Sequence, residues 1–245
     1  MVYVFLPNGQ RLRLRLYPRH KKPPKNGVAE DVPNTLLIFE EGHDDAAFGA
    51  ANEKLAAKVV ESTLINRVNA AILERFPRLG LRDWWLTSGC IAQTVWNLRS
   101  GRPAGEGIAD YDVVYFSEDI SAEAEEQVRR DAAALFADLN VALDVRNQAR
   151  VHLWYPDKFG ISYSPLTSAG EGILRFPSTT TAVGLKCTGD DFLDVYAPFG
   201  LSNLWDMVVK PNRTLPLAEI YKQKAARWQT QWPRLIVRPW VVDVE

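Results

Sequence analysis

DYDVVYF, at residues 110–116, is the stretch that decides the fold. β-Branched and aromatic residues follow the acids, and they predict a strand over Tyr111–Phe116. Side chains two positions apart point to the same face of a strand, so we expect Asp110 and Asp112 to project side by side. Two carboxylates this close either share a proton or hold a cation, and Mg²⁺ prefers such oxygen ligands. The motif therefore predicts a metal-binding pair where a strand begins.

A third acid follows one helix later. The sequence predicts a helix over residues 121–138 and then a strand over Asn140–Arg146, which carries Asp144. If the two strands are neighbours, Asp144 joins Asp110 and Asp112. Three carboxylates are the arrangement that two-metal phosphoryl or nucleotidyl transfer requires. We therefore predict that these three residues are catalytic and that they ligate Mg²⁺ or Mn²⁺.

Upstream of the acids, a glycine turn joins a predicted strand over Asp83–Thr87 to a predicted helix over Ile91–Leu98. The turn is Ser88-Gly89-Cys90. The first turn of a helix offers unpaired N–H groups and the positive end of the helix dipole. Glycine lets a phosphate oxygen approach the backbone closely. The sequence thus predicts a phosphate-binding turn one helix before the acidic pair.

The remaining elements extend this core on both sides. Helical spacing covers residues 45–75, 201–208 and 217–228, and a further strand is predicted over residues 192–196. Val2–Leu6 and Arg11–Tyr17 flank a Pro-Asn-Gly turn and predict a β-hairpin, and the Pro- and Lys-rich residues 18–27 predict an exposed linker. The fold class is therefore α/β (α+β), with a mixed sheet, flanking helices and an N-terminal hairpin. We expect residues 1–40 to form the hairpin and linker, and residues 41–245 to form the main domain.

Composition narrows the range of partners. The formal net charge is −1, so no global field draws the chain to nucleic acid or to a membrane surface. The two cysteines are far apart in the sequence and form no C-x-x-C motif, which argues against a disulfide framework and a cysteine zinc site. No signal peptide and no membrane-spanning run is apparent. We expect a cytoplasmic protein that binds no membrane and for which nucleic acid is an unfavoured partner.

The order of turn, helix, acidic strand, helix and acid-bearing strand resembles the nucleotidyltransferase superfamily of the DNA polymerase β type. Several segments are similar, more narrowly, to a bacterial nucleotidyltransferase-like family of uncertain substrate. These are WLTSGCIAQTVWN (85–97), DYDVVYF (110–116), DVRNQARVHLWY (144–155), FPSTTTAVGL (176–185), APFGLSNLW (197–205) and the YKQK and WPRL segments between residues 221 and 235. The likeness covers roughly residues 50–238.

This resemblance implies an enzyme that moves a nucleoside monophosphate from a nucleoside triphosphate to an unknown hydroxyl or phosphate acceptor. It implies that the backbone N–H groups of Gly89 and Cys90 hold the β- and γ-phosphates, and Ser88 in the same turn is a further candidate for nucleotide binding. Arg146 and Lys186 are further candidates for contacts with phosphate. Neither the base of the triphosphate nor the oligomeric state follows from the sequence.

Two alternatives stay open. Cys90 stands where the family has Ser or Gly, which leaves room for a catalytically inactive protein that acts as a nucleotide-binding or partner-binding regulatory module. A nucleic-acid-binding module that uses the basic N-terminal arm is a weaker alternative. Cys90 and His152 form a formal nucleophile–base combination, but a lone histidine between apolar neighbours is more often packed.

The remaining candidates are three tryptophans near the predicted site and three cations of the C-terminal helix: Trp84, Trp85, Trp96, Lys222, Lys224 and Arg227. The tryptophans have the chemistry to stack on a base, but core packing is the favoured interpretation for aromatic residues at these positions. The cations have the chemistry to contact nucleic acid. Given the overall charge of the chain, a solvated helix face is the favoured interpretation for them.

Overall fold

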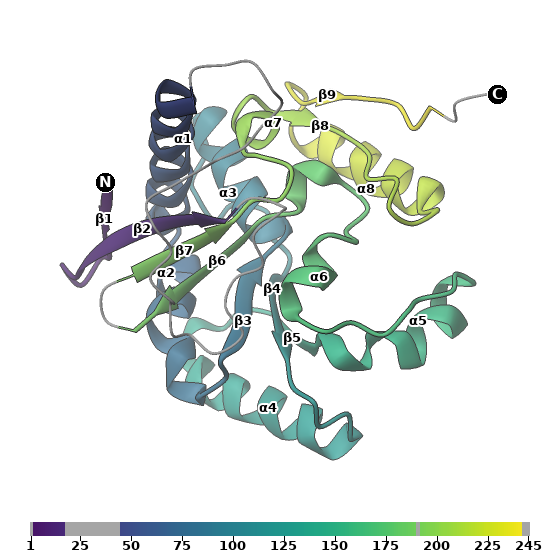
Figure 1. Cartoon of the computed structure of the whole chain (residues 1–245). Coiled ribbons are helices and arrows are strands. Elements are labelled where there is room, and N and C mark those ends of the chain that lie inside the picture. The colour runs from purple at the N-terminus through teal and green to yellow at the C-terminus, as the bar shows by residue number, and fades with distance from the viewer. Residues whose placement is uncertain (1, 18–44, 190–191, 242–245) are drawn as a thin grey trace.

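A seven-stranded mixed sheet forms the centre of the protein in the computed structural model, which describes residues 2–17, 45–189 and 192–241 (Figure 1). Its strands are β1 (Tyr3–Phe5), β2 (Arg11–Tyr17), β3 (Asp83–Thr87), β4 (Tyr111–Phe116), β5 (Leu143–Asn147), β6 (Gly184–Thr188) and β7 (Phe192–Tyr196). They lie in the order β1-β2-β7-β6-β3-β4-β5. The pairs β2–β7 and β4–β5 are parallel and the other neighbours are antiparallel. The predicted α/β class with a mixed sheet is confirmed, whereas the predicted linker at residues 18–27 lies outside the described residues.

Helices and short 3₁₀ segments connect and cover the strands. The α-helices are α1 (Asp45–Ile65), α2 (Arg67–Arg75), α3 (Gly89–Arg99), α4 (Ala122–Leu135), α5 (Val151–Phe159), α6 (Ala169–Ile173), α7 (Ser202–Trp205) and α8 (Ala218–Gln231). The 3₁₀ segments are η1 (Phe76–Leu79), η2 (Ala137–Leu139), η3 (Gln148–Arg150) and η4 (Thr179–Thr181). A small parallel pair, β8 (Val208–Val209) and β9 (Ile236–Val237), lies beside α8. No helix among the described residues is both long and apolar enough to cross a membrane.

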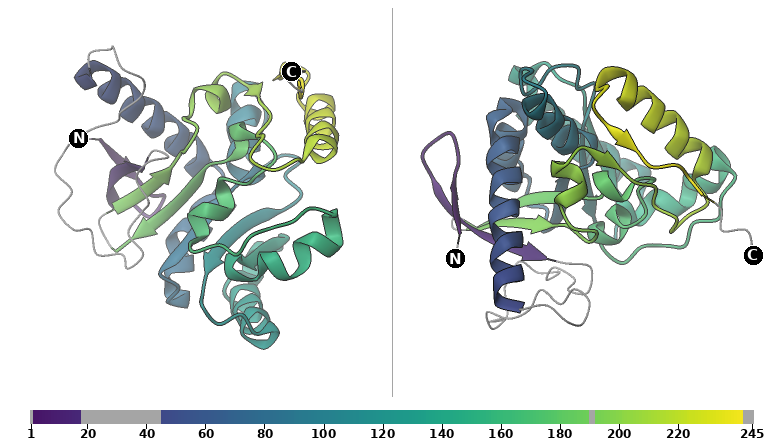
Figure 2. Two further views of the ribbon diagram at one scale, coloured as in Figure 1. Left: turned by 45° about the vertical axis from the view of Figure 1, so that its right-hand side comes forward. Right: turned by 90° about the horizontal axis from the view of Figure 1, so that it is seen from above.

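The two faces of the sheet are covered differently (Figure 2). Helices α1–α4 pack on one face, where Leu86, Val113 and other alternate residues of the strands enter the main hydrophobic core. Alternation with period two sends the neighbouring side chains to the opposite face. There the short helix α6 covers Trp85 and Val114 in a second, smaller apolar cluster. The polar residues that the strands place on this second face are therefore the candidates for a functional site.

The N-terminal hairpin extends the main sheet. Strand β2 runs parallel to β7, with Arg15 opposite Asp194. The Arg15 guanidinium donates to both carboxylate oxygens of Asp194, at 2.5 Å from Nε and 3.0 Å from Nη2. Because Asp194 is only 1% exposed, this bidentate pair is shielded from water and fixes the register of the two strands. The hairpin and α8 lie at opposite ends of the molecule (Figure 2).

The predicted helix over residues 45–75 is two helices that meet at Asn66. The Asn66 side chain accepts a hydrogen bond from the Val68 backbone N–H, which caps α2. An asparagine in an N-cap conformation stops one helix and starts the next. The prediction of one continuous helix is therefore wrong at this residue.

Two other predicted elements are shorter than expected. The strand predicted from Asn140 begins at Leu143, because Asn140 has a left-handed backbone with φ 49°. The helix predicted over residues 201–208 is limited to α7, and β8 follows it. Both errors concern the boundaries of elements whose type was correctly predicted.

The tryptophans of the predicted site region belong to the core. Trp84, Trp85 and Trp96 are each no more than 2% exposed. The Trp96 ring meets Trp228 and Trp232 edge-on, with centroids 5.6 and 5.5 Å apart. This aromatic contact joins α3 to the C-terminal segment and confirms the favoured interpretation of core packing.

Candidate active site

Strands β4 and β5 bring two of the predicted carboxylates together. The strands are parallel neighbours, and Asp112 lies directly opposite Asp144 in their register. Asp110 is exposed and lies one residue before β4. Asp112 also lies opposite Thr87 at the end of β3, so it shares the face of Trp85 and Val114. The acidic side chains thus belong to the face that helices α1–α4 leave uncovered.

The electrostatic surroundings of Asp112 are unusual for a carboxyl group. Burial, together with the negative charges of Asp110 and Asp144, raises the pKa of Asp112 from 3.8 to about 7. A hydrogen bond from the Ser88 hydroxyl and the positive charge of Lys224 act in the opposite direction. The ionised form of Asp112 is therefore disfavoured, first by burial and then by the two neighbouring acids, and a retained proton or a bound cation relieves this cost.

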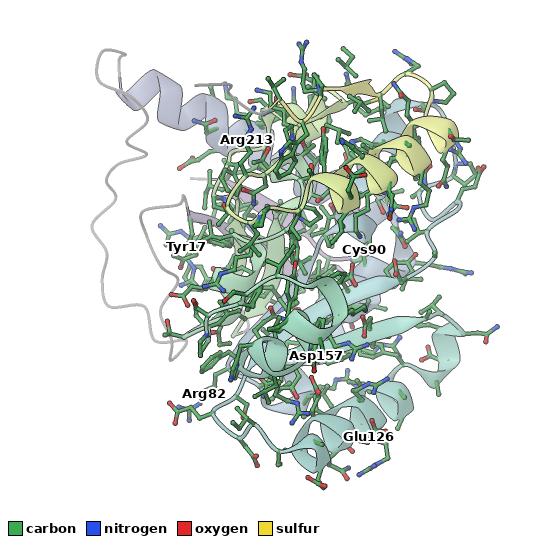
Figure 3. All side chains as sticks on the ribbon, turned by 90° about the vertical axis from the view of Figure 1, so that its right-hand side faces the viewer. Tyr17, Arg82, Cys90, Glu126, Asp157 and Arg213 are labelled. Atoms are coloured by element: carbon green, nitrogen blue, oxygen red, sulfur yellow. The ribbon has the colours of Figure 1, made fainter. Side chains whose placement is uncertain are left out.

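Lys224 is a functional candidate that the sequence did not reveal. We expected the cations of the C-terminal helix to form a solvated face. Lys224 is instead only partly exposed on α8, and its charge acts on Asp112. Figure 3 faces this region, with α8 above the labelled Cys90 and the α5–α6 segment below it. More than a hundred residues separate Lys224 from Asp112 in the sequence, so no local motif reveals this proximity.

Ser88 has a strained backbone at the entrance of α3. Its φ of 69° and ψ of −135° lie in a region that non-glycine residues rarely adopt. Conformations of this kind cost about 1–3 kcal/mol and persist where the surrounding structure demands them. Although Ser88 occupies the N-cap position, its hydroxyl makes no capping bond and is directed to Asp112 instead. The strained turn thereby connects the predicted phosphate-binding turn to the carboxylates.

Gly89 and Cys90 form the first turn of α3. A Cβ atom at Gly89 would lie 2.5 Å from the amide nitrogen of Gln93, so the space beside this backbone is already filled by a side chain. The Cys90 thiol is fully buried and donates to the Thr87 carbonyl at 3.2 Å. The Asp112 backbone N–H donates to the Cys90 sulfur. Cys90 therefore attaches the beginning of α3 to β3 and β4.

These contacts exclude the alternative of Cys90 as a nucleophile. Burial, followed by the charge of Asp112, raises the pKa of the Cys90 thiol well above 9. The thiol therefore stays protonated at neutral pH, whereas nucleophilic attack needs the thiolate. The hydrogen-bond partners of the thiol are backbone groups of Thr87, Ile91 and Asp112, and His152 is not among them.

A buried hydrogen-bond network holds Cys90 and Tyr111, the neighbours of the acidic residues, in place. Thr94 donates to the Cys90 carbonyl at 2.6 Å and accepts from the side-chain amides of Asn66 and Asn69 at 3.0 and 3.1 Å. The Asn66 amide also lies 3.2 Å from the hydroxyl of Tyr111, the residue between the two acids. One network therefore connects α1, α2, α3 and the beginning of β4. Sequence reasoning missed these residues, although polar side chains at apolar helical positions were a readable signal.

The other two predicted phosphate contacts lie in different places. Arg146 is half exposed on β5 and binds Asp144, with 2.7 Å between Nε and Oδ1. Lys186 is 2% exposed, and its ammonium lies 4.4 Å from the centroid of the Trp85 ring. Burial lowers the pKa of Lys186. It lies two residues beyond Gly184, on a strand that β3 separates from β4, so the structure does not bring it to the carboxylates.

Within the described residues, no group of three or more His, Cys, Asp or Glu side chains is arranged to hold a metal ion. The ion pair of Asp144 with Arg146 is a physical reason for this, because it directs one of the three carboxylates to a neighbouring cation. The site therefore consists of Asp112 and Asp144 in register, Asp110 at the entrance, and two cations, Lys224 and Arg146, beside them.

Comparisons with known proteins identify the family of the chain. A family model described as nucleotidyltransferase matches residues 74–237, a range that contains all three acids and Lys224. A structure solved by NMR and described as revealing a CCA-adding enzyme head domain is similar, with a TM-score of 0.58 and 27% sequence identity. The match covers 70% of this chain and 89% of that one. No protein with a curated function matches the sequence significantly. On the extent of the family match, the chain belongs to the nucleotidyltransferase family.

Proposed function

We propose that the protein is a metal-dependent enzyme that transfers a nucleoside monophosphate from a nucleoside triphosphate to a hydroxyl or phosphate acceptor. The observation that carries this proposal is the register of β4 and β5, which sets Asp112 opposite Asp144. The hydrogen bond from Ser88 to Asp112 adds the start of α3 to the same site. The contact between the predicted phosphate-binding turn and Asp112 supports a single site of the kind that two-metal nucleotidyl transfer requires.

The donor atoms fit a divalent cation. Asp110, Asp112 and Asp144 offer hard carboxylate oxygens, which are the ligands that Mg²⁺ and Mn²⁺ prefer. Burial first, and then the negative charges of Asp110 and Asp144, raise the pKa of Asp112, and a bound cation would offset both effects. When bound, the metal would supply charge neutralisation at the phosphates and activation of the attacking oxygen. Asp144 would take part after releasing Arg146, its present partner.

The residues around the metal would then have separate roles in binding and proton transfer. The backbone N–H groups of Gly89 and Cys90 would hold the β- and γ-phosphates, since they lie in the first turn of α3, whereas the Ser88 N–H donates to the Val183 carbonyl. Lys224 would neutralise phosphate charge from the α8 side. Asp144 would accept the proton of the attacking hydroxyl, and Arg146, once released, would pair with phosphate oxygens.

Thermal unfolding tests this proposal. It would be measured with each of the four common ribonucleoside triphosphates, with and without Mg²⁺ or Mn²⁺, on the wild type, on Asp112→Asn and on the control Asp131→Asn, which changes an exposed acid of α4. A ligand at a hundred times its dissociation constant stabilises by about 2.7 kcal/mol. For a chain of this length that corresponds to a shift of roughly 5–10 °C.

We expect a metal-dependent shift with at least one triphosphate that Asp112→Asn abolishes and Asp131→Asn retains. The triphosphate that binds would then be tested for pyrophosphate release in the presence of candidate acceptors. Pyrophosphate release by purified Asp112→Asn at the wild-type rate would contradict the assignment of this carboxylate.

A second candidate function is nucleotide binding without transfer, as a regulatory module. The ion pair between Asp144 and Arg146 favours it, because a carboxylate held by an arginine is not free to ligate a metal. Triphosphate binding that needs no metal and survives Asp112→Asn would support this candidate over the enzyme. Metal-dependent pyrophosphate release would remove it.

A further inference from the structure

A basic pocket lies apart from the carboxylates, where the chain returns from the sheet toward α8. Its volume is about 550 Å³, and its lining includes three cations, Lys210, Arg213 and Arg238. Thr179 of η4 and Phe199 also line the pocket. Among the described residues that line the pocket, none is acidic. Its charge is therefore uniformly positive, in a protein whose net charge is close to zero.

The loop that carries two of these cations is held in place by its own buried asparagine. Asn212 is 3% exposed, and its amide donates to the carbonyls of Leu174 and Phe176 at 2.7 and 2.8 Å. Its side-chain oxygen accepts from the backbone and the hydroxyl of Thr214. The Lys210 backbone bonds to η4 at both its N–H and its carbonyl. The backbone of the pocket is therefore fixed before any ligand arrives, which lowers the entropic cost of binding.

The pocket and the carboxylate site share one helix, α8. The Tyr221 hydroxyl donates to the Arg238 carbonyl at 2.5 Å and lies 3.1 Å from the Val209 carbonyl, which anchors the pocket to the first turns of α8. Lys224, three residues later on that helix, acts on Asp112. In Figure 3 the labelled Arg213 lies near the beginning of α8, and Cys90 lies below the helix. A ligand that extends along α8 would thus be able to occupy the pocket and reach the carboxylates.

We propose that the pocket formed by Lys210, Arg213 and Arg238 binds a phosphate ester group of the acceptor substrate. This inference rests on the proposed transfer function and names the chemical class of its acceptor. Two arginines and a lysine match the charge and geometry of a phosphate, because guanidinium groups pair with its oxygens through parallel N–H donors. No ion pair between described residues engages Lys210 or Arg238.

The remaining features of the pocket agree with a phosphorylated metabolite or a nucleic acid end. The volume lies in the range of small-molecule sites, and Phe199 supplies an apolar surface for a sugar or a base. The triphosphate donor is not the expected ligand, because its phosphates are assigned to the turn Ser88–Cys90, which does not line this pocket. A phosphorylated metabolite and a nucleic acid end both carry a phosphate ester, and the two probes of the following test distinguish between them.

The test measures binding by isothermal titration calorimetry at low ionic strength. The probes are ribose 5-phosphate and a short 5′-phosphorylated oligonucleotide, each with its unphosphorylated counterpart as control. The proteins are the wild type, Lys210→Gln, Arg238→Gln and the double variant. Lys222→Gln serves as the matched control, since Lys222 is an exposed cation on α8 that pairs with Glu219 outside the pocket. Stabilisation by Mg²⁺-triphosphate is measured on every variant to verify its fold and its donor site.

We expect at least one phosphorylated probe to bind and its unphosphorylated counterpart not to bind. Each pocket substitution should weaken that binding about tenfold, the effect of one charge-assisted hydrogen bond, while Lys222→Gln and the stabilisation by triphosphate stay unchanged. The bound probe should also stimulate pyrophosphate release, with a raised KM for the probe in the pocket variants. The probe that binds identifies the source of the phosphate.

Three outcomes would overturn the inference. They are absence of binding by both probes at millimolar concentration, binding that the pocket variants retain, and binding that fails to stimulate pyrophosphate release from a triphosphate that the protein turns over. Failure of the proposed function has a different signature. In that case no triphosphate binds or is turned over, while calorimetry still shows whether the phosphorylated probes bind to the pocket.

Discussion

Replacing Asp112 with asparagine should stabilise the metal-free protein while removing its activity. At pH 8 the carboxylate is ionised in both the folded and the unfolded state, but the folded state disfavours that charge. The rise in pKa from 3.8 to about 7 corresponds to about 4 kcal/mol at 1.36 kcal/mol per pKa unit. Water reaches the partly exposed side chain, so about 2–4 kcal/mol is the expected range. The Ser88 hydroxyl can also donate to the amide oxygen of asparagine, so the substitution keeps a hydrogen bond there, although a weaker one than to a carboxylate.

The pH dependence of this difference has a defined sign. The pKa of Asp112 is higher in the folded state, so between about pH 4 and pH 7 the folded protein keeps a proton that the unfolded chain has released. The wild type therefore loses stability as the pH rises through this window, and asparagine does not. The advantage of Asp112→Asn should be full at pH 8, less than half as large at pH 5, and absent below the unfolded pKa.

Scanning calorimetry with a chelator present measures this prediction at several pH values. For a chain of this size, about 2–4 kcal/mol raises the Tm by roughly 4–16 °C. Asp157→Asn, at an exposed acid of α5, should change stability by no more than about 0.5 kcal/mol. A Tm of Asp112→Asn equal to or below that of the wild type at pH 8, or an advantage that does not vary with pH, would refute the electrostatic reasoning.

Three further predictions concern the surroundings of the site. Thr94→Val removes a buried hydroxyl that makes three hydrogen bonds, and denaturant unfolding should report a loss of about 2 kcal/mol. Lys224→Gln removes a charge that lowers the pKa of Asp112, so the pH midpoint of Mn²⁺ binding, followed by calorimetry, should move upward; an unchanged midpoint would contradict that role. Arg15→Ala leaves the buried Asp194 without its bidentate partner, and urea unfolding should show a loss of about 3 kcal/mol, whereas a change below 0.5 kcal/mol would indicate that the hairpin does not depend on the pair.

The elements of the site could be predicted from the sequence where the local pattern is strong. The strands Arg11–Tyr17 and Tyr111–Phe116 have the predicted bounds, because alternation and β-branched content act within each segment. Helix α3 is present as predicted, but it begins at Gly89, two residues before the predicted start at Ile91. The break at Asn66 was missed because the apolar spacing continues past a residue whose role depends on hydrogen bonds.

What the sequence could not supply is the pairing between distant segments. The neighbouring positions of Asp112 and Asp144 were a condition of the prediction, and only the sheet register supplies them. Lys224 acts on Asp112 because α8 folds back over the site, and no spacing in the chain encodes that approach. Lys186 is buried because β6 is an interior strand with neighbours on both sides. Local patterns therefore predict the elements, and long-range packing decides which side chains meet.

The parallel pairing of β2 with β7 has a consequence for the order of folding during synthesis. Arg15 leaves the ribosome 179 residues before its partner Asp194. At about 5–20 residues per second, the N-terminal hairpin waits on the order of 10–40 s for the strand that completes its pairing. During that interval β2 has an open edge, and its alternating arginines supply the charge that discourages pairing with other chains. The hairpin is thus the first part of the sheet to be made and among the last to be joined to it.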